Sequence, residues 1–170
     1  MTDNKPVISN IIDNLRRIFH ILNEQSKKVQ KDTGLTGPQL WTIKTINENA
    51  PLNLSDLAGR LYLHSTTVVG IIDRLEMQDL VKRTRSKDDR RKVLIDLTEK
   101  GKSLIENAPE VAQGLLVAGL EELPDNSLQE IDRSMRRLVK IFGAQKTPPR
   151  LILSSEVNLP KSKIKKQKEE

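Results

Sequence analysis

The basic side chains of this 170-residue chain gather in one short stretch. Seven lysines and arginines lie between Leu80 and Lys92 against only two aspartates, a local charge of +5 in a chain whose net charge is +6. Such a concentration suits a polyanion, either a nucleic acid or an anionic membrane surface. A solvated basic loop is the alternative interpretation, and the segments that carry these side chains must decide between them.

A group of small hydroxylated residues, Ser65, Thr66 and Thr67, precedes the basic stretch. They begin a segment whose apolar residues recur at helical spacing, at Val68, Ile71, Ile72 and Leu75. Gly70 and Arg74 then face outward. A helix with a small polar leading end can enter the major groove of DNA and hydrogen-bond to base edges or phosphates, helped by its N-terminal dipole.

Helices are also predicted before this segment. An amphipathic pattern runs from Pro6 to about Lys31. Thr36 and Gln39 form a capping box with Pro38 in the first turn, and the helix that they open ends near Asn49. Asn53 caps a further short helix.

After the segment that begins at Ser65, the period changes to that of strands. Leu80 to Arg85 is predicted as a strand, Ser86 to Arg90 as a polar turn, and the residues around Ile95 as a second strand. Helices followed by a basic hairpin are the order of a winged helix-turn-helix. The predicted fold is therefore mainly α with a small β-hairpin wing, and an arginine at the wing tip would enter a minor groove.

The remaining segments predict a helical layer for dimerisation. A long helix starts at Thr98, and Pro109 should kink or divide it. A second capping box, Ser127 to Glu130, opens a final helix. The predicted interface combines apolar positions from both ends of the chain: Ile8, Ile11, Ile12, Leu15, Leu128, Ile131, Met135, Leu138 and Phe142. Packing within one subunit is the alternative for the C-terminal seam.

Composition excludes several classes of protein. Without cysteine there is no disulfide, no thiolate nucleophile and no zinc finger, and two histidines argue against a His-rich metal site. The sequence shows no glycine-rich phosphate loop and no nucleophile elbow, so neither an enzyme nor a bound cofactor is predicted. No apolar run approaches the length needed to span a bilayer, and the first residues do not resemble a signal peptide. A cytoplasmic protein without a membrane partner is expected.

Residues 35–101 resemble the MarR family of winged-helix transcription regulators. The matching elements are Leu35-Thr-Gly-Pro-Gln39, Leu57-Ala58 with Leu61, Ser65-Thr-Thr-Val68, Ile72-Asp-Arg-Leu-Glu76, Leu80-Val-Lys-Arg83, Asp89-Arg-Arg91 with Val93, and Leu97-Thr-Glu-Lys-Gly101. Asp79 stands where the family commonly has glycine, which puts the geometry of that turn in question. The family's oxidant sensing through cysteine is excluded here.

The resemblance implies a homodimer on a pseudo-palindromic DNA operator, a repressor relieved by a small-molecule ligand. It implies Arg91 as the wing-tip arginine, Asp89 as a support of the wing's shape, and Asp73 as an ion-pair partner of Arg91. The predicted DNA-contacting residues are Thr36, Gln39, Ser65, Thr66, Thr67, Gly70, Arg74, Arg83, Arg85, Lys87, Arg90, Arg91 and Lys92.

The ligand site is not identified by the sequence. Trp41 on an apolar stripe belongs either to the core or to an effector pocket, and His20 is a weaker ligand candidate. The alternative functions are a protein-interaction module whose hairpin docks on a partner, and an activator without a small-molecule effector. Binding to DNA would weaken with salt in proportion to the number of phosphate contacts, which a protein-docking hairpin would not do.

The predicted domain organisation has four parts. Residues 1–35 form an N-terminal dimerisation helix, and residues 36–98 form the DNA-binding domain. Residues 99–145 link to and complete the dimerisation helices. Residues 146–170 are a lysine-rich tail with few apolar groups, for which disorder is expected.

Overall fold

A computed structural model describes residues 4–86, 89, 92–149 and 151. Its elements follow one another as α1 (Lys5–Thr33), α2 (Gly37–Asn49), β1 (Leu52–Asn53), α3 (Leu54–Arg60), α4 (Ser65–Met77), β2 (Val81–Arg85), β3 (Val93–Leu97), α5 (Glu99–Ile105), α6 (Ala112–Glu121) and α7 (Asp125–Ile141). The predicted fold class, mainly helical with a small winged sheet, is confirmed.

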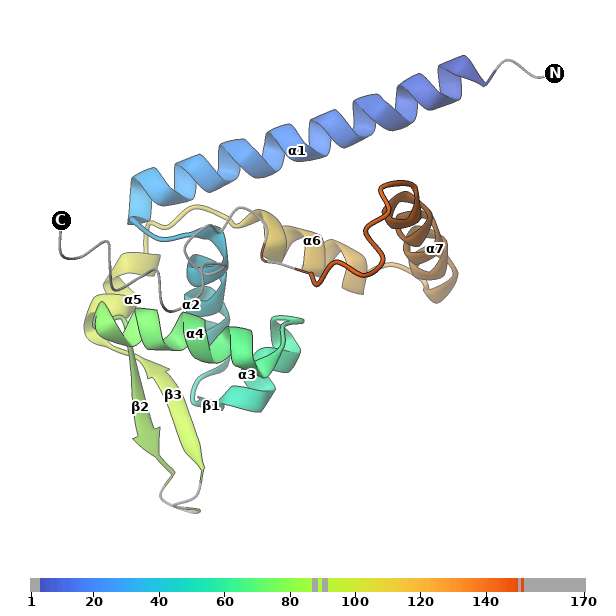
Figure 1. Ribbon diagram of the computed structural model, residues 1–170. Coiled ribbons are helices and arrows are strands. Elements are labelled where there is room, and N and C mark those ends of the chain that lie inside the picture. The colour runs from blue at the N-terminus through green and yellow to red at the C-terminus, as the bar shows by residue number, and fades with distance from the viewer. Residues whose placement is uncertain (1–3, 87–88, 90–91, 150, 152–170) are drawn as a thin grey trace.

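The hydrophobic core lies in the lobe formed by α2 to α5 and the sheet. Its fully buried side chains come from α2 (Leu40, Ile43, Ile46), the α3 region (Leu57, Leu61), α4 (Val68, Ile71, Ile72, Leu75) and β3 (Ile95, Leu97). From α1 only the C-terminal end takes part, through the buried Val29. Figure 1 shows the consequence: the N-terminal half of α1 extends beyond the lobe, and β2 and β3 project away from the opposite side.

The sheet has three antiparallel strands in the order β1-β3-β2, one more than the predicted hairpin. Val81 pairs with Leu97 and Arg85 with Val93 along the hairpin. The additional strand, β1, is only two residues long, with Leu52 opposite Ile95. It escaped the sequence analysis because two residues are too few to show a period of two, and Asn53 also caps α3 as predicted, its Oδ1 accepting from Asp56 N at 2.9 Å.

Pro109 divides the predicted long helix. α5 ends at Ile105, residues 106–111 are not helical, and α6 begins at Ala112. Within this break Val111 is only 3% exposed, so the segment is anchored in the core. Neither α6 nor α7 contains a buried residue, and Figure 1 shows both extending away from the lobe.

The capping box predicted at Ser127 is wrong. α7 begins three residues earlier, with Pro124 at the N-cap and Asp125 in the first turn. The Pro124 carbonyl accepts from Ser127 N at 2.9 Å and from Leu128 N at 3.1 Å. Proline at a helix start has its φ already fixed, which favours the earlier beginning.

Leu151, in the predicted tail, is half-buried and packs against the core. The expected disorder of the tail stays a prediction. Residues 152–170 lie outside the described part of the chain. Among the helices described, none is long and apolar enough to cross a membrane.

Candidate DNA-binding surface

Helix α4 presents its leading end to solvent. Its apolar side chains Val68, Ile71, Ile72 and Leu75 are fully buried, as predicted. Ser65 and Thr66 are exposed, Thr67 is half-buried, and Thr67 N donates to the carbonyl of His64, the N-cap, at 2.9 Å. Gly70 and Arg74 lie on the less buried side of the helix, and no atom lies within 4 Å of a Cβ built on Gly70. The predicted recognition helix is therefore built to accept a contact along this side.

The hairpin carries exposed basic side chains next to this helix. Lys82, Arg85 and Lys92 are exposed. The turn is closed by main-chain bonds, from Ser86 N to the Lys92 carbonyl at 2.9 Å and from Lys92 N to the Asp89 carbonyl at 2.9 Å. Asp89 thus takes part in closing the turn through its main-chain carbonyl, and its wing-supporting role stays a prediction. The predicted contacts Lys87, Arg90 and Arg91 lie outside the described residues, and so does the predicted pair of Arg91 with Asp73.

Arg83 does not extend toward solvent with its basic neighbours. Its Nη2 lies 2.8 Å from Asp73 Oδ1 and its Nη1 lies 2.5 Å from Glu76 Oε2, both on α4. Both ends of the guanidinium bind carboxylates of α4, and the predicted contact of Arg83 with DNA stays a prediction. Asp73 supports the wing, but through Arg83 on β2.

The residues at the start of α2 hold one another. Gln39 Oε1 accepts from Thr36 N at 2.9 Å and from Thr36 Oγ1 at 3.1 Å, which confirms the predicted capping box. Gln39 is 2% exposed and Thr36 is half-buried. Gln39 is therefore enclosed, with its acceptor oxygen occupied by Thr36, and its contact with DNA stays a prediction.

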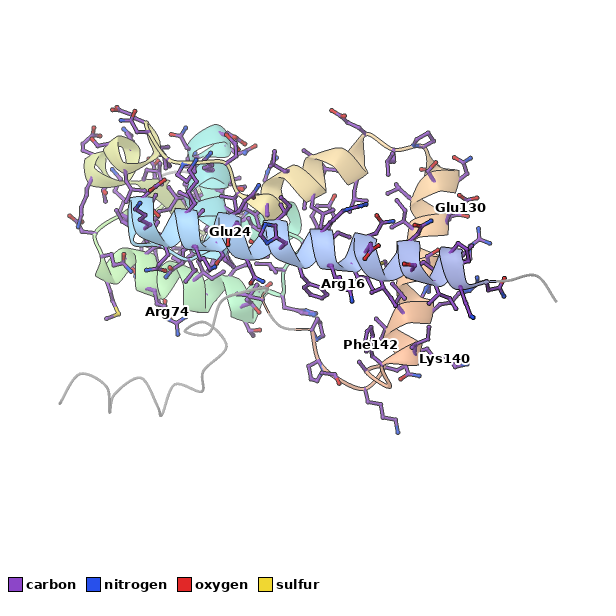
Figure 2. The ribbon with its side chains drawn as sticks, turned by 90° about the horizontal axis from the view of Figure 1, so that it is seen from above. Arg16, Glu24, Arg74, Glu130, Lys140 and Phe142 are labelled. Atoms are coloured by element: carbon purple, nitrogen blue, oxygen red, sulfur yellow. The ribbon has the colours of Figure 1, made fainter. Side chains whose placement is uncertain are left out.

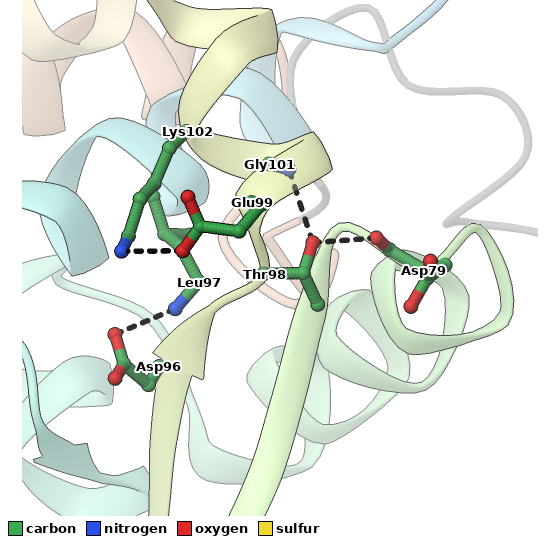
Figure 3. A network of polar contacts seen from close by, with 7 residues as sticks. All are labelled: Asp79, Asp96, Leu97, Thr98, Glu99, Gly101 and Lys102. Atoms are coloured by element: carbon green, nitrogen blue, oxygen red, sulfur yellow. Dashed lines mark hydrogen bonds and ion pairs between the residues drawn. The ribbon is translucent and has the colours of Figure 1, made fainter.

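The base of the wing is closed by the polar network in Figure 3. Thr98 Oγ1 donates to the Asp79 carbonyl at 2.6 Å and accepts from Gly101 N at 3.0 Å. Asp79 has φ +59°, a left-handed conformation that aspartate tolerates better than most residues, so the turn forms without the family's glycine. At the same corner Lys102 Nζ lies 2.8 Å from Glu99 Oε1, and this hydrogen bond lowers the pKa of Glu99.

A cavity of about 340 Å³ opens between α2 and α6, with Trp41 among its lining residues. Two hydrogen bonds join the helical lobe to the residues at either end of α6. Lys44 Nζ donates to Glu110 Oε1 at 3.0 Å, and Tyr62 Oη donates to Glu121 Oε1 at 2.7 Å. The bond to Glu121 raises the pKa of Tyr62. His20 is exposed on α1 and is not among the residues that line this cavity.

Nothing among the described side chains resembles a metal centre. No group of three or more His, Asp or Glu residues is placed to hold an ion in the part of the chain that the structure describes.

Comparison with known proteins agrees with this geometry. A model of the MarR family matches residues 35–93. The HTH-type transcriptional regulator MgrA of Staphylococcus aureus is 31% identical over 122 residues, which are 71% of this chain and 81% of MgrA. The chain belongs to the MarR family. The uncharacterized HTH-type regulator YsmB of Bacillus subtilis is 26% identical over 131 residues, 77% of this chain and 90% of YsmB. A MarR family protein from Bacillus stearothermophilus matches in structure with a TM-score of 0.51 and 27% identity, covering 82% of this chain and 98% of that protein.

As a MarR-family protein the chain is a DNA-binding transcription regulator and not an enzyme. The resemblance of its motifs predicted this family, but the sequence did not predict the two ion pairs of Arg83. Strand alternation carried the signal: Val81 is buried, Lys82 is exposed and Arg83 is half-buried, so Arg83 shares the face of β2 that packs on the helices. Its acidic partners identify α4 as the helix that it meets.

Proposed function

We propose that this MarR-family regulator is a homodimeric repressor that binds a pseudo-palindromic operator and releases it when a small molecule binds. In this proposal residues 36–98 bind DNA, and residues 1–35 and 99–145 form the dimer. Ser65, Thr66, Thr67, Gly70 and Arg74 contact the major groove. Arg85, Lys92 and the basic residues between them reach the flanking backbone and minor groove.

The observation that carries the dimer is the apolar surface left uncovered in a single chain. Ile8 is 54% exposed, Met135 49% and Phe142 74%, and these residues come from both ends of the chain. Figure 2 shows Phe142 beside the C-terminal end of α7. The remaining predicted interface residues are also exposed or half-buried: Ile11, Ile12, Leu15, Leu128, Ile131 and Leu138. A second subunit that covers them supplies the burial that α6 and α7 lack, because exposed apolar surface of this extent marks an interface.

Sedimentation tests the dimer with a pair of variants that add the same charge to α7. Met135→Glu places a carboxylate among the apolar positions, and Gln129→Glu places one at an exposed polar position. We expect Met135→Glu, and likewise a chain truncated before Leu128, to sediment as a monomer with weakened DNA affinity, while Gln129→Glu remains a dimer. A truncated chain that is still dimeric would contradict the interface.

The operator sequence can be identified by selecting bound duplexes from a random-sequence library. Gel shifts with the selected duplex then measure its affinity. Arg91→Ala tests the wing: we expect a loss of about 1–3 kcal/mol in operator binding, in the range of one specific groove contact. Unchanged binding by this variant would remove the wing tip from the mechanism. A reporter gene behind the selected operator tests repression, which predicts lower expression when the regulator is present.

The cavity beside Trp41 is the proposed effector site, because it lies between α2 of the DNA-binding lobe and α6 of the proposed dimer layer. A ligand bound there would contact both helices and could change the position of the DNA-binding lobe relative to the dimer layer. Trp41 is the only tryptophan in the chain, so its fluorescence reports occupancy directly. We expect compounds that change this fluorescence to release the selected duplex. Compounds that change the fluorescence and leave DNA binding unaltered would contradict the effector role.

A further inference from the structure

Two neighbouring basic residues of β2 have different surroundings. Lys82 is exposed, whereas the side chain of Arg83 is 27% exposed and is engaged by two carboxylates. Replacing either residue by a neutral one removes one positive charge, but only Arg83 connects β2 to α4. The pair therefore separates the effect of charge from the effect of position.

The partners of Arg83 lie one turn apart on the recognition helix. Asp73 and Glu76 are three residues apart, so their side chains share one face of α4. The planar guanidinium places one nitrogen on each, Nη2 on Asp73 and Nη1 on Glu76. A lysine ammonium is a point charge without this fork, so it cannot reproduce both bonds in the same geometry.

This bridge has two physical effects on a DNA-binding surface. It neutralises carboxylates on the helix that approaches a polyanion, where they would otherwise repel phosphates. It also ties β2 to the C-terminal half of α4, close to the left-handed turn at Asp79 that joins the two elements. The angle between recognition helix and wing is thereby held by a polar bridge as well as by the connecting turn.

We infer that Arg83 is a positioning residue for operator recognition: it holds the wing at a set angle to α4 and does not itself touch DNA. The inference rests on the proposed operator binding. A wing at the wrong angle loses its groove while its charges still attract phosphates. Loss of Arg83 therefore lowers the preference for the operator more than it lowers the general attraction to DNA.

The test compares Arg83→Met with Lys82→Met, on the selected operator duplex and on a duplex of random sequence. For Arg83→Met we expect operator affinity to fall about tenfold, the order expected from losing two ion pairs near the surface, with random-duplex affinity changing less than about twofold. Lys82→Met should weaken both duplexes by the same small factor. Arg83→Lys should fall between Arg83→Met and the unmodified chain. Equal losses on both duplexes for Arg83→Met would overturn the inference.

A second test removes the negative charges of Asp73 and Glu76, for which the inference predicts the opposite of the usual electrostatic effect on operator preference. Removing negative charge from a DNA-binding surface ordinarily strengthens binding. We expect Asp73→Asn and Glu76→Gln to lower the ratio of operator to random-duplex affinity, because each releases Arg83 from one bond. A ratio that rises in both variants would overturn the inference. Thermal unfolding of each variant identifies a folding defect, and these two amide variants test the inference if Arg83→Met does not fold.

The outcomes for this inference and for the proposed function are distinct. An unmodified chain with no preference for any duplex overturns the proposed function and this inference with it. An unmodified chain that prefers its operator, with the same ratio in Arg83→Met, overturns only the role of Arg83.

Discussion

Gly101 lies so close to the main chain of Leu80 that a Cβ built on the glycine would stand 2.1 Å from the Leu80 carbonyl oxygen. The same oxygen accepts from Thr98 N at 3.1 Å. The start of α5 is thus pressed against the residue that precedes β2, and glycine is the only residue that fits there. This contact gives a physical reason for the glycine that ends the Leu97-Thr-Glu-Lys-Gly101 motif.

We expect Gly101→Ala to lower the free energy of unfolding by about 1–3 kcal/mol, because the methyl group must push α5 away from Leu80. Gly119→Ala is the matched control. Gly119 is also helical, but nothing lies within 4 Å of its Cβ position, so alanine should raise stability by about 0.5–1 kcal/mol. Urea unfolding measures both. A Gly101→Ala chain as stable as the unmodified one would contradict the close contact.

The left-handed turn at Asp79 predicts opposite effects for two substitutions. Glycine adopts this φ of +59° without strain, so Asp79→Gly should leave stability unchanged or raise it by up to about 1 kcal/mol. Asp79→Val should lower it by roughly 1–2 kcal/mol, because a β-branched side chain resists this conformation. The bond from Thr98 uses the Asp79 carbonyl and persists in both variants. Similar stabilities of the glycine and valine variants would show that the turn is not left-handed.

Tyr62 should titrate above its ordinary range, because its hydroxyl donates to Glu121. A raised pKa in the folded state means that the unfolded chain loses this proton first. The stabilising contribution is therefore complete below the ordinary tyrosine pKa of about 10, and it is lost as the pH rises through the folded value. Tyr62 is the only tyrosine, so tyrosinate absorbance follows it alone.

The Glu121→Gln variant separates the charge of Glu121 from its place beside Tyr62. A glutamine can still accept the hydrogen bond, but it carries no charge to oppose the tyrosinate. The pKa of Tyr62 should return toward its ordinary range in this variant. Identical titration curves for the unmodified chain and for Glu121→Gln would show that the charge of Glu121 does not raise the pKa of Tyr62.

The uncovered apolar faces predict a stability that depends on protein concentration. If a partner supplies the burial of α6 and α7, dilution shifts the chain toward its less stable monomer and the melting temperature falls. Calorimetry over a hundredfold range of concentration measures this, and the monomeric Met135→Glu variant should show no such dependence. If the melting temperature of the unmodified chain does not depend on concentration, dimer formation does not contribute to its stability.

Local periodicity was sufficient to predict the helices and their buried faces. Val68, Ile71, Ile72 and Leu75 are all fully buried, because their burial follows from one helix packing on one core. The capping box of Thr36 and Gln39 is equally local, and it formed. The same residues were also predicted to contact DNA, because a motif match does not distinguish a polar side chain that contacts a ligand from one that completes a helix end.

The sequence did not predict the contacts between segments. Arg83 was grouped with its basic neighbours because the local charge gave no sign of Asp73 and Glu76, which approach only after β2 packs on α4. The cavity beside Trp41 likewise depends on residues of α6, including Gly114, whose Cβ position lies 3.3 Å from the indole. Strand alternation shows which face of β2 Arg83 lies on, but no spacing along the chain identifies its partners on α4 or the lining of the cavity.

The break at Pro109 bears on how far apart the recognition helices of a dimer would stand. A continuous helix from Thr98 to Glu121 would be a stiff rod that fixes this separation by its length. Here the lobe connects to its surroundings through the segment 106–111 and through the turn after α1, where Gly34 has φ +71°. In a dimer we expect this separation to depend on the packing of Val111 and on the bonds at Glu110 and Glu121, and not on the length of one rigid helix. Operators with different spacers between their half-sites, assayed against the same protein, would measure its stiffness directly.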